Sequence, residues 1–254
     1  MHSETRDYMP VDIKKPDKGC SIDKSKSKDD ISKYNASFQD FFKLVEWFDK
    51  FGKAEYIIFK DISSWPVLVI FKEIHDNADV KLDNFKAFTK FKQYFNFLWT
   101  EWTNKEVEAI WDILKLQWNV KNSVDFILNW KASFSSVAIE EFYWSNLNTC
   151  GIDLDWKDLK NLSWFKIIPK IAKKFWISIW EAIDWWHKNG NDYVISQRNN
   201  LWLNNIRDIL ITWNNNWKNF VPLIAWGAHA IDLKEKAEKY WFKWVIIFTP
   251  KSYK

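Results

Sequence analysis

Two of the four histidines follow short apolar segments, and each lies among other polar residues. His75 comes after VLVIF in the stretch KEIHDN, which also contains Glu73, and His229 comes after PLIA in WGAH. Glu101 follows a third apolar segment, FNFL. Imidazole and carboxylate groups that converge can hold Zn, Mn or Fe with an open coordination position, and the metal then activates a bound water or polarises a carbonyl group. These residue types predict a metal site with an open position, at which a spare glutamate moves the proton. The alternative for each histidine is a capping or hydrogen-bonding role in a loop.

Arg198 lies on the apolar side of a predicted helix in NDYVISQRNNLWLNNIRDIL. At helical spacing it shares a stripe with Val194, Ile195 and Leu201, where an unpaired guanidinium is unfavourable. We therefore expect it to meet a carboxylate or a bound anion, with Asn199 as its neighbour at the site. This leaves two alternatives, a contact with substrate or a buried Arg–Glu or Arg–Asp bridge that holds the helix.

The segments before these residues are typical of buried strands. Short continuous apolar runs alternate with stretches of helical periodicity, which predicts an α/β fold with a mixed, largely parallel central sheet flanked by helices. The runs are 66–71, 95–98, 220–225 and 245–248. A further candidate strand, TCGID (149–153), ends at Asp153. Ligands of open α/β sheets bind beyond the carboxyl ends of the strands, so we expect the polar residues to meet there, with Asp153 among the substrate-binding residues.

The chain divides into a polar tail and one folded domain. Residues 1–34 mix Lys, Asp, Ser and Pro with few large apolar residues, which is typical of a disordered tail. Residues 35–254 are expected to form a single α/β domain with a helical insertion at about 104–190 between two halves. The halves form a weak internal repeat of strand, short turn and helix, in which His75 and His229 occupy corresponding places.

Glycines predict the ends of two helices. SFQDFFKLVEWFDKF has apolar residues at helical spacing and stops at Gly52. His187, in DWWHKNG, is expected to cap the C-terminus of another helix before Gly190.

Charge and composition argue against several classes of protein. The 254 residues include 37 basic and 33 acidic ones, a net charge of +4, which is too balanced for electrostatic binding of nucleic acid. No apolar run approaches the roughly 20 residues of a membrane span, and the N-terminus has no apolar signal core. Two cysteines cannot form a disulfide framework. We expect a cytoplasmic protein with no nucleic-acid partner and no membrane span.

The tryptophan and glycine contents are abnormal. The chain has 20 Trp and 5 Gly, whereas globular proteins contain about 7% Gly. Some tryptophans lie in helix-to-strand links, where the backbone often needs a positive φ that glycine adopts easily. We predict that many of them are glycines in the cellular protein, encoded by UGA codons that are read as glycine. The codons to inspect are those of Trp99, Trp226, Trp241 and Trp244. The alternative is a genuinely tryptophan-rich protein.

Four motifs, in order, resemble the TraB/Tiki/ChaN/erythromycin-esterase-like superfamily. Its members share a glycine-xx-histidine motif after an early strand, a glutamate after the next strand, an Arg-Asn pair on a late helix, and a second glycine-xx-histidine motif. The corresponding segments here are FKEIHDN (71–77), FLWTEW (97–102), SQRNN (196–200) and IAWGAHA (224–230). Lys72 and Trp226 stand where the two motifs have glycine.

The resemblance implies that both histidine motifs face one cleft of a hydrolase that cleaves an amide or ester bond in a small peptide or ester. In such an enzyme His75, His229 and Glu101 would hold a divalent metal (Mn, Co or Zn), and Glu73 or Glu101 would be the general base. Arg198 would steady a substrate carboxylate or the oxyanion.

Two alternatives to the enzyme stay open. One is a non-catalytic protein of the ChaN or TraB type that binds haem or a small peptide. The other is an interaction protein whose histidines are structural. A homodimer is also left open by the sequence.

Overall fold

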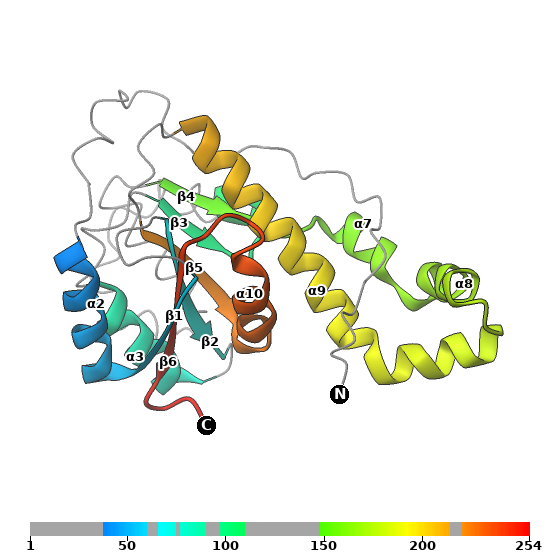
Figure 1. Cartoon of the computed structure of the whole chain (residues 1–254), viewed down its shortest axis with the longest axis horizontal. Coiled ribbons are helices and arrows are strands. Elements are labelled where there is room, and N and C mark those ends of the chain that lie inside the picture. The colour runs from blue at the N-terminus through cyan, green and yellow to red at the C-terminus, as the bar shows by residue number, and fades with distance from the viewer. Residues whose placement is uncertain (1–37, 60–65, 75–76, 90–96, 110–147, 214–219) are drawn as a thin grey trace.

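The computed structural model describes residues 38–59, 66–74, 77–89, 97–109, 148–213 and 220–254. These ranges form a six-stranded sheet in the order β1-β6-β2-β5-β3-β4, with helices on both faces (Figure 1). None of the helices in these ranges combines the length and the apolar character needed to cross a lipid bilayer. The expected disordered tail, residues 1–34, lies outside the described residues.

The sheet is mixed and largely parallel, as the alternation of apolar runs and helical stretches predicted. Its strands are β1 (Gly52–Ile58), β2 (Val67–Glu73), β3 (Phe97–Thr100), β4 (Asn148–Gly151), β5 (Phe220–Trp226) and β6 (Trp244–Pro250). Only the edge strand β1 is antiparallel to its neighbour among the described pairs. Strands β2, β5 and β6 are buried along nearly their whole length, because helices cover both faces.

Alternate residues of the strands face two separate hydrophobic cores. Val69 and Phe71 of β2 pack with helices α2 (Phe38–Phe51) and α3 (Ala78–Thr89) on one face. Leu68 and Ile70 pack on the other face with α9 (Ile179–Trp213) and α10 (Ala230–Ala237). This alternation follows from the two-residue period of a strand. The α9 and α10 face is the one that meets the candidate site.

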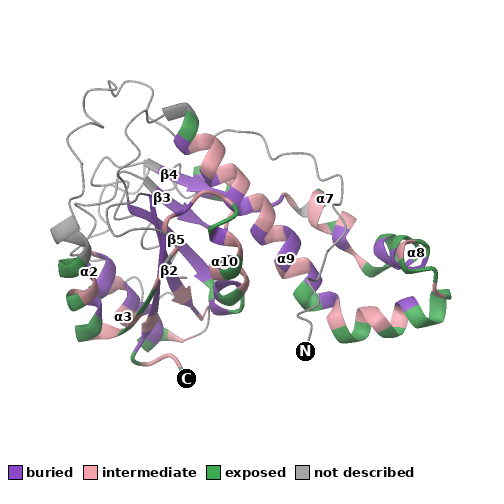
Figure 2. Ribbon diagram, viewed as in Figure 1, coloured by how far each residue is buried: buried purple, intermediate pink, exposed green. Residues whose placement is uncertain are grey.

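A helical arm projects beside the sheet, within the predicted insertion (Figures 1 and 2). The arm consists of α7 (Trp156–Leu159), η2 (Lys160–Leu162), α8 (Trp164–Phe175) and the first half of α9. It has a core of its own, whose fully buried members include Ile167, Ala182 and Tyr193. Helix α9 therefore belongs to two cores, one in the arm and one on the sheet.

The predicted helix end at Gly190 is wrong, because α9 continues through this glycine to Trp213. Gly190 is buried against the Trp186 ring, and a Cβ atom built at Gly190 would lie 2.7 Å from that ring. The glycine thus serves close packing within a helix rather than helix termination. His187 is consequently an exposed residue in the interior of α9 and not a C-terminal cap.

The helix end predicted at Gly52 is confirmed, since α2 stops at Phe51 directly before this glycine. The strand β1 that begins there was not predicted. Its sequence, GKAEYII, lacks a long apolar run because it lies at the edge of the sheet, with Glu55 and Tyr56 exposed.

Candidate functional site

The ends of β2, β5 and β3 lie at one rim of the sheet, which is where the sequence predicted the site. Strands β2 and β5 are parallel neighbours, with Glu73 opposite Trp226, and β3 pairs with the other side of β5. The stretch after β2 that contains His75 lies outside the described residues. The stretch after β5 forms the short 3₁₀ turn η3 (Gly227–His229).

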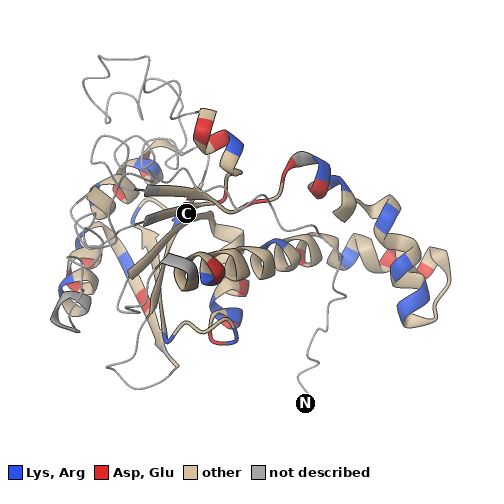
Figure 3. Cartoon of the chain, turned by 90° about the horizontal axis from the view of Figure 1, so that it is seen from above, with Lys and Arg blue, Asp and Glu red and all other residues tan. Residues whose placement is uncertain are grey.

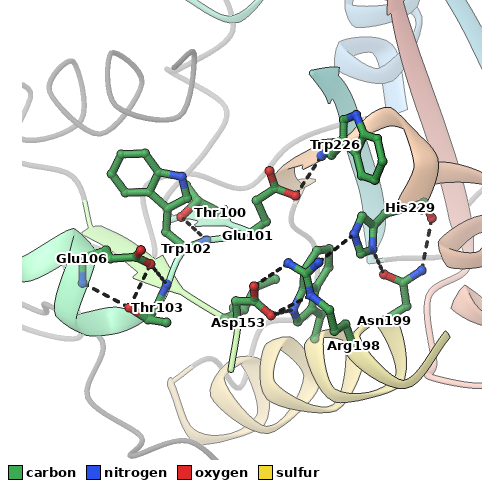
Figure 4. A network of polar contacts seen from close by, with 12 residues as sticks. Thr100, Glu101, Trp102, Thr103, Glu106, Asp153, Arg198, Asn199, Trp226 and His229 are labelled. Carbon is green, nitrogen blue, oxygen red and sulfur yellow. Dashed lines mark hydrogen bonds and ion pairs between the residues drawn. The ribbon is translucent and has the colours of Figure 1, made fainter. Parts of the chain in front are cut away.

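His229 is fully buried and its ring is held from three sides (Figure 4). Its Nδ1 lies 2.6 Å from Oδ1 of Asn199, and its ring stacks on Trp202 with the centroids 4.4 Å apart. Its Nε2 lies 3.4 Å from Nη1 of Arg198. The imidazole is therefore fixed in position and turned with Nε2 toward the guanidinium.

Arg198 is anchored by Asp153, which follows β4. Nε of Arg198 donates to Oδ1 of Asp153 at 3.0 Å, and Nη2 donates to Oδ2. The indole N–H of Trp202 donates to the same carboxylate at 3.1 Å, and the guanidinium lies over the Trp202 ring. Such a two-bond contact fixes both the position and the plane of the guanidinium. The Arg–Asp bridge expected as one alternative is thus present, and it aims Arg198 at His229.

The Asp153–Arg198 pair is largely withdrawn from water, with 8% and 20% of the two side chains exposed. Burial raises the pKa of the Asp153 carboxyl above its ordinary value, although the Arg198 guanidinium and the Trp202 N–H lower it. Removing Arg198 would therefore leave a buried carboxylate without its main counter-charge, which is costly.

A second set of contacts lies behind His229. Nδ2 of Asn199 donates to the carbonyl oxygen of His229 at 3.2 Å and to Oδ2 of Asp232 at 2.8 Å. Asp232 in turn pairs with Lys236 at 2.9 Å, and Lys236 donates to the carbonyl oxygen of Ser196. Burial lowers the pKa of Lys236, while Asp232 raises it. These contacts join α10 to α9 beside the ring.

Both carboxylates predicted for catalysis lie at the same rim. Oε2 of Glu101 accepts the backbone N–H of Trp226 at 2.9 Å, which ties the end of β3 to the end of β5 (Figure 4). Glu73 is the last residue of β2 and is fully buried. Asp153, Arg198, Asn199 and His229 form one contacting group, and Glu101 lies beside its β5 side.

In the part of the chain that the structure describes, no three His, Cys, Asp or Glu side chains lie close enough to hold a metal ion. His75, one of the predicted metal ligands, lies outside the described residues. The guanidinium of Arg198 also limits metal binding by His229, because its Nη1 lies 3.4 Å from Nε2, the ring nitrogen that would bind the metal. A cation, or the iron of a haem, could reach Nε2 only if Nη1 withdrew.

Sequence reasoning missed Trp202, Asp232 and Lys236. Their spacing held a signal, since Trp202 is four residues after Arg198, and Lys236 is four residues after Asp232. Such pairs lie on one helix face. That these faces point at His229 depends on how α9 and α10 cross, which the spacing does not specify.

The chain was compared with protein-family models, with curated proteins and with solved structures, and it matched none of them. The resemblance to the TraB/Tiki superfamily therefore stays a prediction that depends on the four motifs.

Proposed function

We propose that this rim is the active site of a hydrolase that cleaves an ester or amide bond in a small substrate. The observation that supports the proposal most is the guanidinium of Arg198, which Asp153 holds by two bonds beside His229. A cation fixed in advance near a sheet rim can stabilise an oxyanion or bind a substrate carboxylate without reorganising. Arg198 would have this role.

A carboxylate supplies the proton transfer in this proposal. Glu101 would act as general base toward the attacking water, since it lies at the end of β3 next to the site. Glu73, the other predicted base, continues the series of Val69 and Phe71 along β2, which places it on the α2 and α3 face of the sheet and not on the face of the site. A divalent metal such as Mn, Co or Zn would lower the pKa of that water if Glu101 and the two histidines held it, and this would require Nη1 of Arg198 to move away from Nε2 of His229. Asn199 would keep His229 in place, and Asp153 would keep Arg198 in place.

The direct test is hydrolysis by the purified chain with each metal, on a panel of small peptides and esters. We expect activity in at least one combination, and we expect Arg198→Lys to lower kcat/KM by about 100-fold or more, because a lysine cannot reproduce the two-bond geometry. Arg207→Lys is the matched control, because Arg207 pairs with its neighbour Asp208 and lies nine residues beyond Arg198 on α9. Arg207→Lys should leave kcat/KM unchanged.

Metal content supplies the second measurement. We expect stoichiometric Mn, Co or Zn that is lost in His75→Ala and reduced in His229→Ala. Equal metal content in both variants and the unaltered chain would rule out the metal role. A Soret band on titration with haem, without hydrolysis of any substrate, would instead support the non-catalytic binding protein.

A further inference from the structure

Asp232, in the first turn of α10, takes no part in the proposed reaction, yet it contacts the group that orients His229. Its Oδ2 accepts a hydrogen bond from Nδ2 of Asn199 at 2.8 Å. The same oxygen forms an ion pair with Nζ of Lys236 at 2.9 Å. Lys236 is itself fixed to Ser196 of α9 by bonds to the backbone carbonyl and to the hydroxyl. Asp232 is thus a carboxylate with a charge partner and a fixed position.

The neighbours of Asn199 decide which way its side-chain amide points. An amide has a donating NH₂ end and an accepting oxygen end, and the two are told apart by their hydrogen-bond partners. Here the NH₂ end meets two acceptors, the carbonyl oxygen of His229 and the carboxylate of Asp232. Reversing the amide would set its oxygen against both of them. The oxygen end must therefore face the imidazole.

This orientation has a consequence for the ring of His229. The amide oxygen of Asn199 lies 2.6 Å from Nδ1, and an oxygen that can only accept requires a proton on that nitrogen. At the opposite side of the ring, Nη1 of Arg198 lies 3.4 Å from Nε2. A guanidinium can only donate, so its position fits an unprotonated Nε2. Both neighbours favour the same arrangement of protons.

We propose that Asp232 is a positioning residue that acts through Asn199 to hold His229 as a neutral imidazole with its proton on Nδ1 and its lone pair on Nε2. The use of that lone pair depends on the proposed hydrolase, where Nε2 accepts a proton or a metal from the rim. The tautomer itself does not depend on it. A hydrogen-bond partner at one ring nitrogen commonly determines which nitrogen of a histidine is available to react.

The proposal is tested on the full chain, labelled with ¹⁵N-histidine, without substrate or metal. Two-bond ¹H–¹⁵N correlation spectra distinguish protonated from unprotonated ring nitrogens, and His229→Gln identifies the signals of His229 among those of the four histidines. We expect a protonated Nδ1 and an unprotonated Nε2. A proton on Nε2 would overturn the proposal, whatever the chain hydrolyses.

Variants separate positioning from general stability. We expect Asp232→Ala to lower the Nδ1–H to Nε2–H ratio by about tenfold, the effect of one net hydrogen bond of ordinary strength. Asn199→Leu should lower it further, because only Arg198 then favours an unprotonated Nε2. Asp208→Ala is the matched control, because Asp208 also pairs with a basic residue but lies nine residues after Asn199 on α9, which at 3.6 residues per turn is the opposite side of the helix. It should leave the ratio unchanged.

The same variants distinguish this proposal from the proposed function. If the chain hydrolyses a substrate, Asp232→Ala should lower kcat with little change in KM, because Asp232 touches neither substrate nor reacting atoms. If the chain hydrolyses nothing and the Nδ1–H tautomer is still found, the proposed function fails while this inference stands. An unchanged tautomer ratio in Asp232→Ala would overturn the inference, and an unchanged ratio in Asn199→Leu would show that Asn199 does not set the tautomer either.

Discussion

Trp241 and Trp176 adopt backbone conformations that tryptophan rarely tolerates. Their φ angles are 86° and 55°, in the left-handed region. The N–H of Phe242 bonds to the carbonyl of Ala237 and that of Trp241 to Glu238, which is the helix ending in which glycine usually occupies the Trp241 position. Trp176 ends α8 in a related way. These two positions support the prediction that some tryptophans stand for glycine.

The other tryptophans proposed as misread glycines differ from Trp241. Trp99 and Trp244 are 1% and 2% exposed members of the two cores, and neither has a positive φ. Trp226 has a φ of −53° at the end of β5. Their backbones do not require glycine, so only the codons can show whether these three residues are tryptophan or glycine in the cellular protein.

We expect Trp176→Gly to stabilise the protein by about 1 kcal/mol, the lower end of the cost of a left-handed conformation for an ordinary residue. Its side chain is 94% exposed, so little packing is lost. Chemical denaturation measures the change. Trp202→Gly is the control, because a fully buried tryptophan beside His229 should cost about 3 kcal/mol or more when removed. A destabilising Trp176→Gly would contradict the glycine interpretation at that position.

At the scale of elements, the sequence predicted the strands better than their pairing. The apolar run 66–71 located β2, but the strand continues to Glu73, because Lys72 and Glu73 keep the extended backbone after the apolar pattern ends. The spacing also predicted that Arg198 needs an anion. That the anion is Asp153 follows from β4 lying beside β3 at the edge of the sheet, which local spacing cannot specify.

The last residues of the chain, 251–254, follow β6 and contact β2, α3 and the turn after β5. Lys72 lies over the Tyr253 ring at 4.6 Å, and Ser252 donates to Asp83 of α3 at 2.8 Å. A Cβ atom at Gly227 would lie 1.8 Å from the Tyr253 hydroxyl, so the tyrosine packs directly on the second histidine motif. Lys72, which stands where the first motif has glycine, is thus engaged by the same tyrosine.

We therefore expect Gly227→Ala to displace Tyr253 and to lower the free energy of unfolding by about 1 kcal/mol. In a Tyr253→Ala background the same substitution should cost almost nothing, which a double-mutant cycle by chemical denaturation measures. Gly52→Ala is the control, because a Cβ there would lie 2.2 Å from the backbone oxygen of Thr249. Its cost should be the same with and without Tyr253, and equal costs for Gly227→Ala in both backgrounds would refute the contact.

At the scale of the whole molecule, the helical arm carries an unusually apolar surface. Large side chains at 44% exposure or more lie in α8 and at the turn into α9, where Figure 2 shows exposed (green) stretches between buried and intermediate ones. They are Trp164, Phe165, Phe175, Trp176, Ile179 and Trp180. Around them α8, with the sequence WFKIIPKIAKKF, has lysines and no acidic residue, and its basic positions are blue in Figure 3. An apolar patch of this kind favours association, while the lysines oppose contact between two copies.

The two effects predict how the chain self-associates. We expect association through the arm that strengthens as salt is added, because salt screens the repulsion between lysines and leaves apolar burial intact. Sedimentation velocity over a series of concentrations and ionic strengths measures this. The variant Trp164→Gln/Trp176→Gly/Trp180→Gln should sediment as a monomer under the same conditions, with glutamine chosen to preserve the helices. Trp226→Gln, which removes an exposed tryptophan at the rim instead, should associate like the unaltered chain. If the triple variant associates as strongly as the unaltered chain, the arm is not the contact surface. If the cellular protein has glycine at these three positions, it should sediment as a monomer, as the triple variant does.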